Sequence, residues 1–169
     1  YRGEEHGEVT CLMRSRWTYS FNVDGSVDVS IKVQANESLL PLPRVGARLI
    51  LRRLPETVSW LGRGPHENYP DRKQSADLGY WCLPRGAMHT PYIFPSENGL
   101  RCDVRCAQLG DFAIERLDTD LAFSVSEFCV DTLMTAQHTN DLDAADALHL
   151  HIDGFHMGEG GDDSCCILY

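Results

Sequence analysis

The sequence predicts an all-β protein, an antiparallel β-sandwich, and its hydrophobic periodicity is the main reason. Apolar and polar residues alternate over residues 17–23 and again over residues 27–33, as they do on strands with one buried face. The turn-forming run Asp24-Gly25-Ser26 separates these stretches, so residues 17–33 should form a β-hairpin. Short strands separated by close turn signals favour a sandwich over a parallel α/β fold.

Further strands follow from the same alternation or from short apolar runs bounded by turn residues. They are expected at residues 47–54, 58–61, 100–106, 112–117, 121–125 and 148–153. Two stretches are candidates for short helices. One is residues 130–137, with Ser126 or Asp131 as its N-cap, and the other is residues 141–148. Helix should therefore account for less than about a fifth of the chain.

Length and composition are those of a globular domain. The chain has 169 residues, of which 43% are hydrophobic and 24% charged, close to the averages for soluble proteins. We therefore expect residues 1–169 to form a single domain. The polar start, residues 1–7, has no initiator Met and no signal-peptide core, so we interpret the chain as part of a longer one. No apolar run approaches the roughly 18 residues of a membrane span.

The charge balance argues against two classes of partner. With 15 Lys and Arg residues against 25 Asp and Glu residues, the formal net charge is −10. Proteins that follow nucleic-acid phosphates or anionic membranes need a positive surface. Neither nucleic acid nor a membrane is therefore expected as a partner.

Seven cysteines, at positions 11, 82, 102, 106, 129, 165 and 166, include no C-x-x-C pair. An odd number of cysteines without a secretory leader favours reduced, buried thiols over disulfides or zinc. We therefore expect a cytoplasmic protein.

Acidic residues in the loops allow two interpretations. A glycosidase needs two carboxylates about 5–9 Å apart across the sugar, and Glu67, Asp71, Glu97 and the pair Asp162-Asp163 are candidates. The alternative is structural: these loop carboxylates pair with Arg72, Arg101 or backbone N–H groups and hold the loops together. We favour the structural interpretation for Glu67, Asp71 and Glu97.

A histidine cluster near the end of the chain also has two interpretations. His149, His151 and Asp153 share one face of a predicted strand, and His156 follows. Three nitrogens and a carboxylate can hold a metal ion, but such an alternation is more often the solvent face of an edge strand. The glycine-rich run at 158–164 lacks the Lys and the following helix of a phosphate-binding loop. Its flexibility suits a loop that closely approaches a ligand.

Three longer motifs are far more specific. They are WLGRGPHENYPDR at residues 60–72, YIFPSENGLRC at 92–102 and IDGFHMGEGGDDS at 152–164. In this order they closely resemble the C-terminal domain (small-chain region, domain 5) of the large β-galactosidases of glycoside hydrolase family 2. The resemblance covers residues from about 10 to 164, which is most of the chain.

The resemblance implies a fold for this chain and indicates which part of the parent enzymes holds the catalytic residues. The domain is an antiparallel supersandwich of the galactose-mutarotase type, here a truncated part of it. The parent enzymes hydrolyse terminal β-D-galactosides such as lactose and form homo-oligomers. Their catalytic glutamates and magnesium lie in a TIM barrel, which takes about 250 residues. This chain would therefore partner that barrel, touch the β-galactoside and make subunit contacts, but would have no activity alone.

The resemblance also assigns residues. The substrate loop would comprise Gly160, Gly161, Asp162, Asp163, Ser164 and Cys165, with Cys165 where the family has a sugar-stacking tryptophan. The carbonyl groups of Phe94 and Pro95 match a sodium site of some members, whose further ligands would fall near Leu133 and Ala136. The loops of the first two motifs would form the scaffold, through His66, Glu67, Asn68, Asp71, Arg72, Glu97, Asn98 and Arg101.

Two other functions stay open at this point. The chain could be a stand-alone carbohydrate-binding or mutarotase-like sandwich, although His66 and Glu67 are adjacent and would point in opposite directions on an extended chain. It could also be a structural remnant that binds no ligand.

Overall fold

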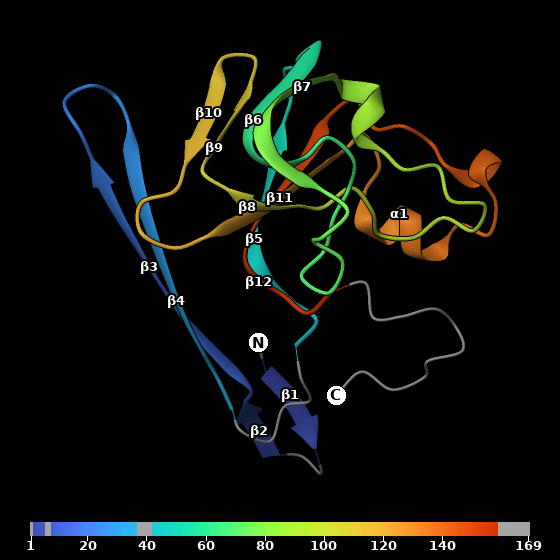
Figure 1. Ribbon diagram of the computed structural model, residues 1–169. Helices are drawn as coiled ribbons and strands as arrows, with labels where there is room; N and C mark the ends of the chain where they lie inside the picture. Colours follow the sequence, from blue (N-terminus) through green and yellow to red (C-terminus); the bar gives the residue numbers. More distant parts are fainter. Residues whose placement is uncertain (1, 6–7, 37–41, 159–169) are drawn as a thin grey trace. The chain divides into compact units, whose positions relative to one another are not determined.

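The computed structural model describes residues 2–5, 8–36 and 42–158 (Figure 1). By its internal contacts the chain divides into two compact units, residues 1–42 and 43–169. Among the described residues, no helix has both the length and the apolar character that crossing a membrane requires.

The first unit consists of two antiparallel pairs of strands. Strands β1 (Arg2–Glu5) and β2 (Glu8–Cys11) form the shorter pair, and β3 (Met13–Phe21) and β4 (Val27–Ala35) form the longer one. In the longer pair Trp17 lies opposite Ile31 and Tyr19 opposite Val29, which puts the apolar residues on one face. The predicted hairpin is thus confirmed. At its tip, Gly25 has φ 88°, a value that favours glycine.

The second unit contains two four-stranded antiparallel sheets, labelled in Figure 1. The first sheet has the order β10-β9-β6-β7, and the second has the order β5-β12-β11-β8. The strands are β5 (Arg44–Leu51), β6 (Thr57–Gly64), β7 (Asp77–Pro84), β8 (Arg101–Val104), β9 (Cys106–Leu109), β10 (Phe112–Glu115), β11 (Leu121–Ser126) and β12 (Leu148–His156).

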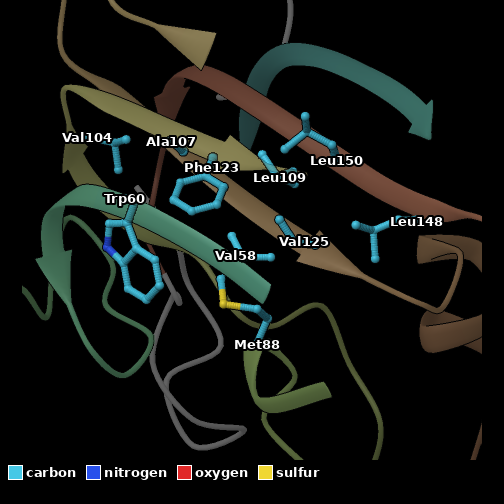
Figure 2. Close-up of a cluster of buried hydrophobic side chains, with 10 residues drawn as sticks. All are labelled: Val58, Trp60, Met88, Val104, Ala107, Leu109, Phe123, Val125, Leu148 and Leu150. Carbon is cyan, nitrogen blue, oxygen red and sulfur yellow. The ribbon is translucent and has the colours of Figure 1, made fainter. Parts of the chain in front are cut away.

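The hydrophobic core lies between these two sheets (Figure 2). On β6, Val58 and Trp60 point inward, and they meet Phe123 and Val125 of β11. The Trp60 and Phe123 rings pack edge to face, with centroids 6.0 Å apart. Both sheets contribute to one apolar layer, so the prediction of an antiparallel β-sandwich is confirmed. Its buried members are Val58, Trp60, Met88, Val104, Ala107, Leu109, Phe123, Val125, Leu148 and Leu150.

The helical predictions were only partly correct. Helix α1 (Val130–Thr135) lies within the predicted segment, but its N-cap is Cys129 rather than Ser126 or Asp131. The helix predicted over 141–148 is wrong. The 3₁₀ turn η2 (Thr139–Asp141) precedes an irregular stretch, and β12 begins at Leu148 because its alternating residues pair with β5 and β11. A second 3₁₀ turn, η1 (Arg85–Met88), buries Met88 in the core.

Two strand boundaries also differ from the sequence prediction. Residues 77–84 were not predicted as a strand, yet β7 pairs along its whole length with β6. The strand predicted over 100–106 is divided into β8 and β9, and Asp103 near the break has φ 54°. The Asp103 carboxylate accepts hydrogen bonds from Lys73 (2.5 Å) and Arg63 (2.6 Å), which join this residue to the preceding loop and to β6.

The core position of Phe123 leads to a first prediction. Because its ring is fully buried against Trp60, Phe123→Ala should lower the free energy of unfolding by about 3–5 kcal/mol. Phe155, which is 52% exposed on the neighbouring strand β12, provides a matched control. Phe155→Ala should cost less than about 1 kcal/mol. Denaturant titration of both variants tests this, and similar losses would contradict the position of the core.

Candidate functional site: a polar cluster under two loops

The second sheet of the sandwich has an outer face that is polar and partly buried. On this face β5 carries Arg44 and Gly46, β12 carries Asp153, and β11 carries Ser124. Two loops, residues 65–76 and 89–100, lie against it. Tyr69 and Leu100 of these loops pack with Cys102 of β8. The motifs singled out in the sequence are therefore brought together on one side of one sheet.

Arg44 is at the centre of the first group of contacts, which we call the Arg44 cluster: Arg44, Tyr69, Glu97, Ser124, Asp153 and His156. Its guanidinium donates to Asp153 through Nε (2.9 and 2.8 Å) and Nη2 (2.6 Å). It also donates to Ser124 Oγ at 3.0 Å and to Glu97 Oε1 at 3.4 Å. A Cβ at position 46 would lie 2.2 Å from the Asp153 carboxylate, so only glycine fits beside this ion pair.

Glu97 accepts a hydrogen bond from Tyr69 Oη at 3.3 Å and lies 3.9 Å from His156 Nε2. Burial raises the pKa of Glu97 to about 7, although Arg44 and the Tyr69 hydroxyl oppose this shift. A carboxyl group of this kind carries a proton for part of the time at neutral pH. Perturbed carboxyl groups are often found at functional sites.

Glu67 is the centre of the second group of contacts. Its carboxylate accepts from the Gly99 N–H at 2.8 Å, from Arg72 Nη2 at 3.1 Å and from the Tyr92 hydroxyl. Burial opposes ionisation, but these hydrogen bonds outweigh it and hold the pKa of Glu67 below its usual value. The expected pairing of Glu67 with Arg72 and a backbone N–H is confirmed. Glu67 therefore links the two loops.

The partners of Glu97 and Arg101 differ from those that the sequence predicted. Glu97 pairs with Arg44, not with Arg72 or Arg101. Arg101, 2% exposed, donates instead to the carbonyl oxygens of Met88, Gly99 and Pro65. Burial lowers the pKa of Arg101 to about 10. Charge patterning alone identified these residues but could not assign carbonyl partners to a buried guanidinium.

The remaining scaffold candidates mostly serve the loops themselves. Asn68 accepts from the Cys102 N–H at 2.9 Å, and Asn98 accepts from the Thr90 N–H at 3.0 Å. His66 is exposed and lies 3.4 Å from Ser75 Oγ. Asp71 lies beside Gly158, where a Cβ would be 2.6 Å from its carboxyl carbon. All the predicted scaffold residues thus belong to, or adjoin, the two loops.

The histidines of β12 were expected to form the solvent face of an edge strand, and this prediction is wrong. Strand β12 is central in its sheet, and His149 is buried, with no hydrogen-bond partner for either ring nitrogen. Burial and the neighbouring arginines lower the pKa of His151 to about 4. No group of three metal-binding side chains occurs within residues 2–5, 8–36 and 42–158.

The cysteines are free thiols at the four positions where the structure describes them. Cys102 is buried, and burial raises its pKa to about 11, as expected for an inert thiol. Cys82 is exposed, contrary to the expectation of buried thiols, because it lies on the outer face of the edge strand β7.

The predicted substrate loop, Gly160 to Cys165, lies outside the described residues. The structure describes the two residues that follow β12, Met157 and Gly158. Gly158 directly follows Met157, whose N–H donates to Pro43 O at 2.8 Å. The Arg44 cluster and Asp71 therefore surround the point where the chain leaves β12.

Sequence reasoning missed four residues of this site, Arg44, Tyr69, Tyr92 and Ser124. It identified Asp153 but not the residues that Asp153 contacts. Asp153 and Arg44 are 109 positions apart, so no local pattern connects them. Gly46, opposite Asp153 in the register, was the available signal, because a glycine inside a strand often marks a close approach.

Together the fold and the site define a class: an antiparallel β-sandwich domain whose outer sheet face carries loops fixed by partly buried ion pairs. Comparison with known proteins gives the family. A family model described as "Beta galactosidase small chain" matches residues 3–168, and this chain belongs to that family.

Curated relatives named "Beta-galactosidase" agree with this assignment. The protein of Aeromonas hydrophila subsp. hydrophila is 51% identical over 154 residues, which cover 89% of this chain and 15% of the relative. That of Psychromonas ingrahamii is 48% identical, covering 90% and 14%. That of Vibrio cholerae is 48% identical, covering 90% and 15%. The chain thus spans only about one seventh of the length of these relatives.

The raised pKa of Glu97 leads to a second prediction. Between pH 4.5 and about 7 the folded state binds more protons at Glu97 than the unfolded state does, so this residue's contribution to stability falls as pH rises. Glu97→Gln should remove that loss. The stability of Glu97→Gln relative to the parent should increase by about 1–3 kcal/mol from pH 5 to pH 8.

Denaturant titrations of both proteins at several pH values would measure this difference. His151 acts in the opposite direction, because its lowered pKa costs stability as pH falls from 6.5 to about 4. Its effect is common to both proteins and cancels in the comparison. A pH-independent difference would show that Glu97 is ionised throughout.

Proposed function

We propose that this chain is the C-terminal sandwich of a β-galactosidase that hydrolyses terminal β-D-galactosides such as lactose. In this proposal it contributes an active-site loop and subunit contacts, and not the catalytic glutamates. The observation that carries the proposal is the position of the third motif. It begins on the central strand β12 and continues past the fixed residue Gly158 into the glycine-rich run. Family membership and the names of the relatives support it.

The contacts of Glu67 and Glu97 support a non-catalytic role. A glycosidase needs one carboxyl group for the leaving oxygen and another for the opposite face of the sugar. Glu67 is 6% exposed and accepts from an arginine, a tyrosine and a backbone N–H. Glu97 faces Arg44, Tyr69 and His156. Both carboxyl groups are engaged in holding loops, so the chemistry is assigned to the TIM-barrel part of the parent enzyme.

The parent would supply further partners. Its TIM barrel would hold the magnesium ion, and the intact enzyme would be a cytoplasmic homo-oligomer. A sodium ion bound by the carbonyl groups of Phe94, Pro95 and Leu133 fits one feature of the structure. Helix α1 ends at Thr135, and the Gln137 N–H, the usual partner of the Leu133 carbonyl, donates to Asp141 instead. Carbonyl oxygens suit such a hard cation, which would hold the loop and the helix end together.

The alternative proposal is a stand-alone carbohydrate-binding or mutarotase-like sandwich. A mutarotase needs a histidine and a glutamate that converge on one sugar ring. His66 is exposed toward Ser75, whereas Glu67 is buried beneath Arg72 and Gly99. Calorimetric titration of the isolated chain with galactose and lactose separates the proposals. Binding at millimolar sugar would favour the alternative.

A third prediction concerns activity. The isolated chain should not hydrolyse an aryl β-galactoside above background, because in the proposed function the paired catalytic glutamates lie in the TIM barrel, outside this chain. The measurement is release of the aryl alcohol by purified chain, with Glu67→Gln and Glu97→Gln as controls. Turnover that survives purification and disappears in either variant would make this chain an enzyme in its own right.

A fourth prediction concerns Cys165, which lies outside the described residues. An aromatic side chain there would stack on the sugar, a contact worth about 1.5–3 kcal/mol by burial. Cysteine has neither that area nor the aromatic face, so Cys165→Trp should lower KM by one to two orders of magnitude, at about 1.4 kcal/mol per tenfold.

The measurement is KM for lactose after complementation of a C-terminally truncated β-galactosidase by both versions of the chain. Cys166→Trp is the matched control and should leave KM at the parental value. Equal KM values for the parent and Cys165→Trp would show that position 165 does not reach the sugar.

A further inference from the structure

Strand β4 has one long edge that no other strand covers among the described residues. It pairs only with β3, in a sheet of two strands. The pairing runs from the Met13–Ala35 pair to the Phe21–Val27 pair without a shift of register, so β4 is regular over all nine of its residues. Natural proteins often protect such an edge with a proline or a bulge, and β4 has neither. Its backbone is therefore open to a further strand.

The hydrogen bonds at the two ends of the hairpin show which backbone groups of β4 face this free edge. The Asn22 N–H donates to the Ser26 carbonyl at 2.9 Å, and the Asn36 N–H donates to the Leu12 carbonyl at 2.9 Å. Along an antiparallel ladder every second pair of facing residues is hydrogen-bonded, so the even-numbered residues of β4 bond to β3. The N–H and C=O groups of its odd-numbered residues point away from β3, toward the free edge.

Pairing with a further strand would stabilise the β3–β4 hairpin. A two-stranded ribbon is only marginally stable alone in water, and three or more strands are usually needed. On β4, Val27 is 42% exposed, Val29 43% and Val33 37%. A strand beside β4 would cover part of these side chains through cross-strand contacts.

The sequence of β4 is complementary to itself. If two copies of β4 run antiparallel about a two-fold axis at Ser30, the residues that face each other lie equally far before and after Ser30. Apolar residues then face apolar residues, and an aspartate faces a lysine; the facing pairs are Val27–Val33, Asp28–Lys32 and Val29–Ile31. The odd-numbered pairs are those whose backbone groups point toward the free edge, so this register also forms the hydrogen bonds of a ladder.

Charge complementarity favours a second copy as the partner. Within one hairpin, Lys32 lies directly opposite Arg16, and Asp28 lies opposite Ser20. Like charges that face each other destabilise a ladder, and opposite charges stabilise it. In the self-paired register the Asp28 carboxylate of each copy faces the Lys32 ammonium group of the other, and the two-fold axis forms this pair twice.

Strand β3 lacks this complementarity. In antiparallel self-pairing about Thr18, Ser15 would face Phe21 and Arg16 would face Ser20. An aromatic ring would then face a polar side chain, and the cation would face no anion. Of the two free edges of the hairpin, β4 is therefore the one that fits a copy of itself.

We propose that β4 is a dimerisation strand, through which two copies of this chain pair antiparallel about Ser30. The two hairpins would then form one four-stranded antiparallel sheet in the order β3-β4-β4-β3. This inference goes beyond the proposed function, because the pairing needs neither a galactoside nor a TIM barrel. Its failure would leave the proposed function unaffected.

Sedimentation equilibrium of the full chain at micromolar concentrations tests the proposal, and the parent should sediment as a dimer. Asp28→Lys would bring lysines face to face between the copies, and Lys32→Asp would bring aspartates face to face. Each change turns two attractive contacts into two repulsive ones, so each should raise the dissociation constant of the dimer at least about tenfold. Lys32→Asp also places an anion opposite Arg16 in its own hairpin, so loss of the dimer in that variant does not come from loss of the hairpin.

Recombining the charges should restore the dimer. The double variant Asp28→Lys/Lys32→Asp is again complementary to itself, and an equimolar mixture of the two single variants should form a heterodimer. Both should have dissociation constants within about threefold of the parental value. Arg14→Asp is the matched control, because it makes the same change in net charge as Lys32→Asp but lies on β3, opposite Gln34. It should leave the dissociation constant unchanged.

Cross-linking tests the register. Two residues that face each other in a non-hydrogen-bonded pair have Cα atoms about 4.5 Å apart, within the span of a disulfide. Ser30→Cys should therefore give a disulfide-linked dimer when the chain is treated with oxidised glutathione. Thr18→Cys, opposite Ser30 on β3, should give no more cross-linked chain than the parent does.

Three results would overturn the inference. The first is a parental chain that stays monomeric, which would mean that another part of its own polypeptide covers the edge or that the edge stays free. The second is a dimer that persists in both single variants, or one that the double variant and the mixture fail to restore. The third is a failure of Ser30→Cys to cross-link more than Thr18→Cys, which would place the contact between the copies elsewhere.

Discussion

A buried guanidinium is the interaction on which the loops of this sandwich depend. Arg101 begins β8, and its charge is removed from water next to the ring of Trp60, 5.5 Å from the ring centroid. The cost of burying that charge is offset by carbonyl groups from three separate segments, at Pro65, Met88 and Gly99. These carbonyls accept from Nη1 and Nη2, whereas the buried Nε has no hydrogen-bond partner among the described residues. Arg101 thereby joins the apolar core to both loops.

The Glu67 carboxylate adds a second charged contact to the loop that Arg101 holds. Glu67 accepts from the Gly99 N–H while Arg101 donates to the Gly99 carbonyl, so both polar groups of one glycine are used by charged side chains. Gly99 has φ 82°, and a Cβ there would lie 2.8 Å from the Met88 carbonyl oxygen. The glycine, the cation and the anion are therefore mutually dependent, and loss of one partner leaves a buried charge unpaired.

Local patterns were enough to predict the sandwich but not the contacts of its polar face. The alternation over 148–153 identified a strand because period two depends on neighbouring residues alone. The burial of His149 and Asp153 and the partial burial of His151 depend on β5, about a hundred positions earlier, and on loops that cover the face. The helix predicted over 141–148 failed for the same reason, since pairing with Leu51 of β5 fixed Leu148 as strand. The pairing of Glu67 with Arg72 was predictable because the two are close in sequence.

The two faces of the second sheet make different kinds of contact, apolar on the inner face and polar on the outer face. Its inner face contributes to the apolar core through Leu148 and Leu150, and the free energy from that burial does not depend on pH or on a partner. The outer face carries ionisable groups whose contacts are directional, so they specify where the backbone goes and make part of the stability depend on pH. Because β12 belongs to both faces, its position is fixed by the apolar core on one side and by the Arg44 cluster on the other. Opposite faces of the same sheet thus supply the pH-independent core and the contacts that hold the two loops.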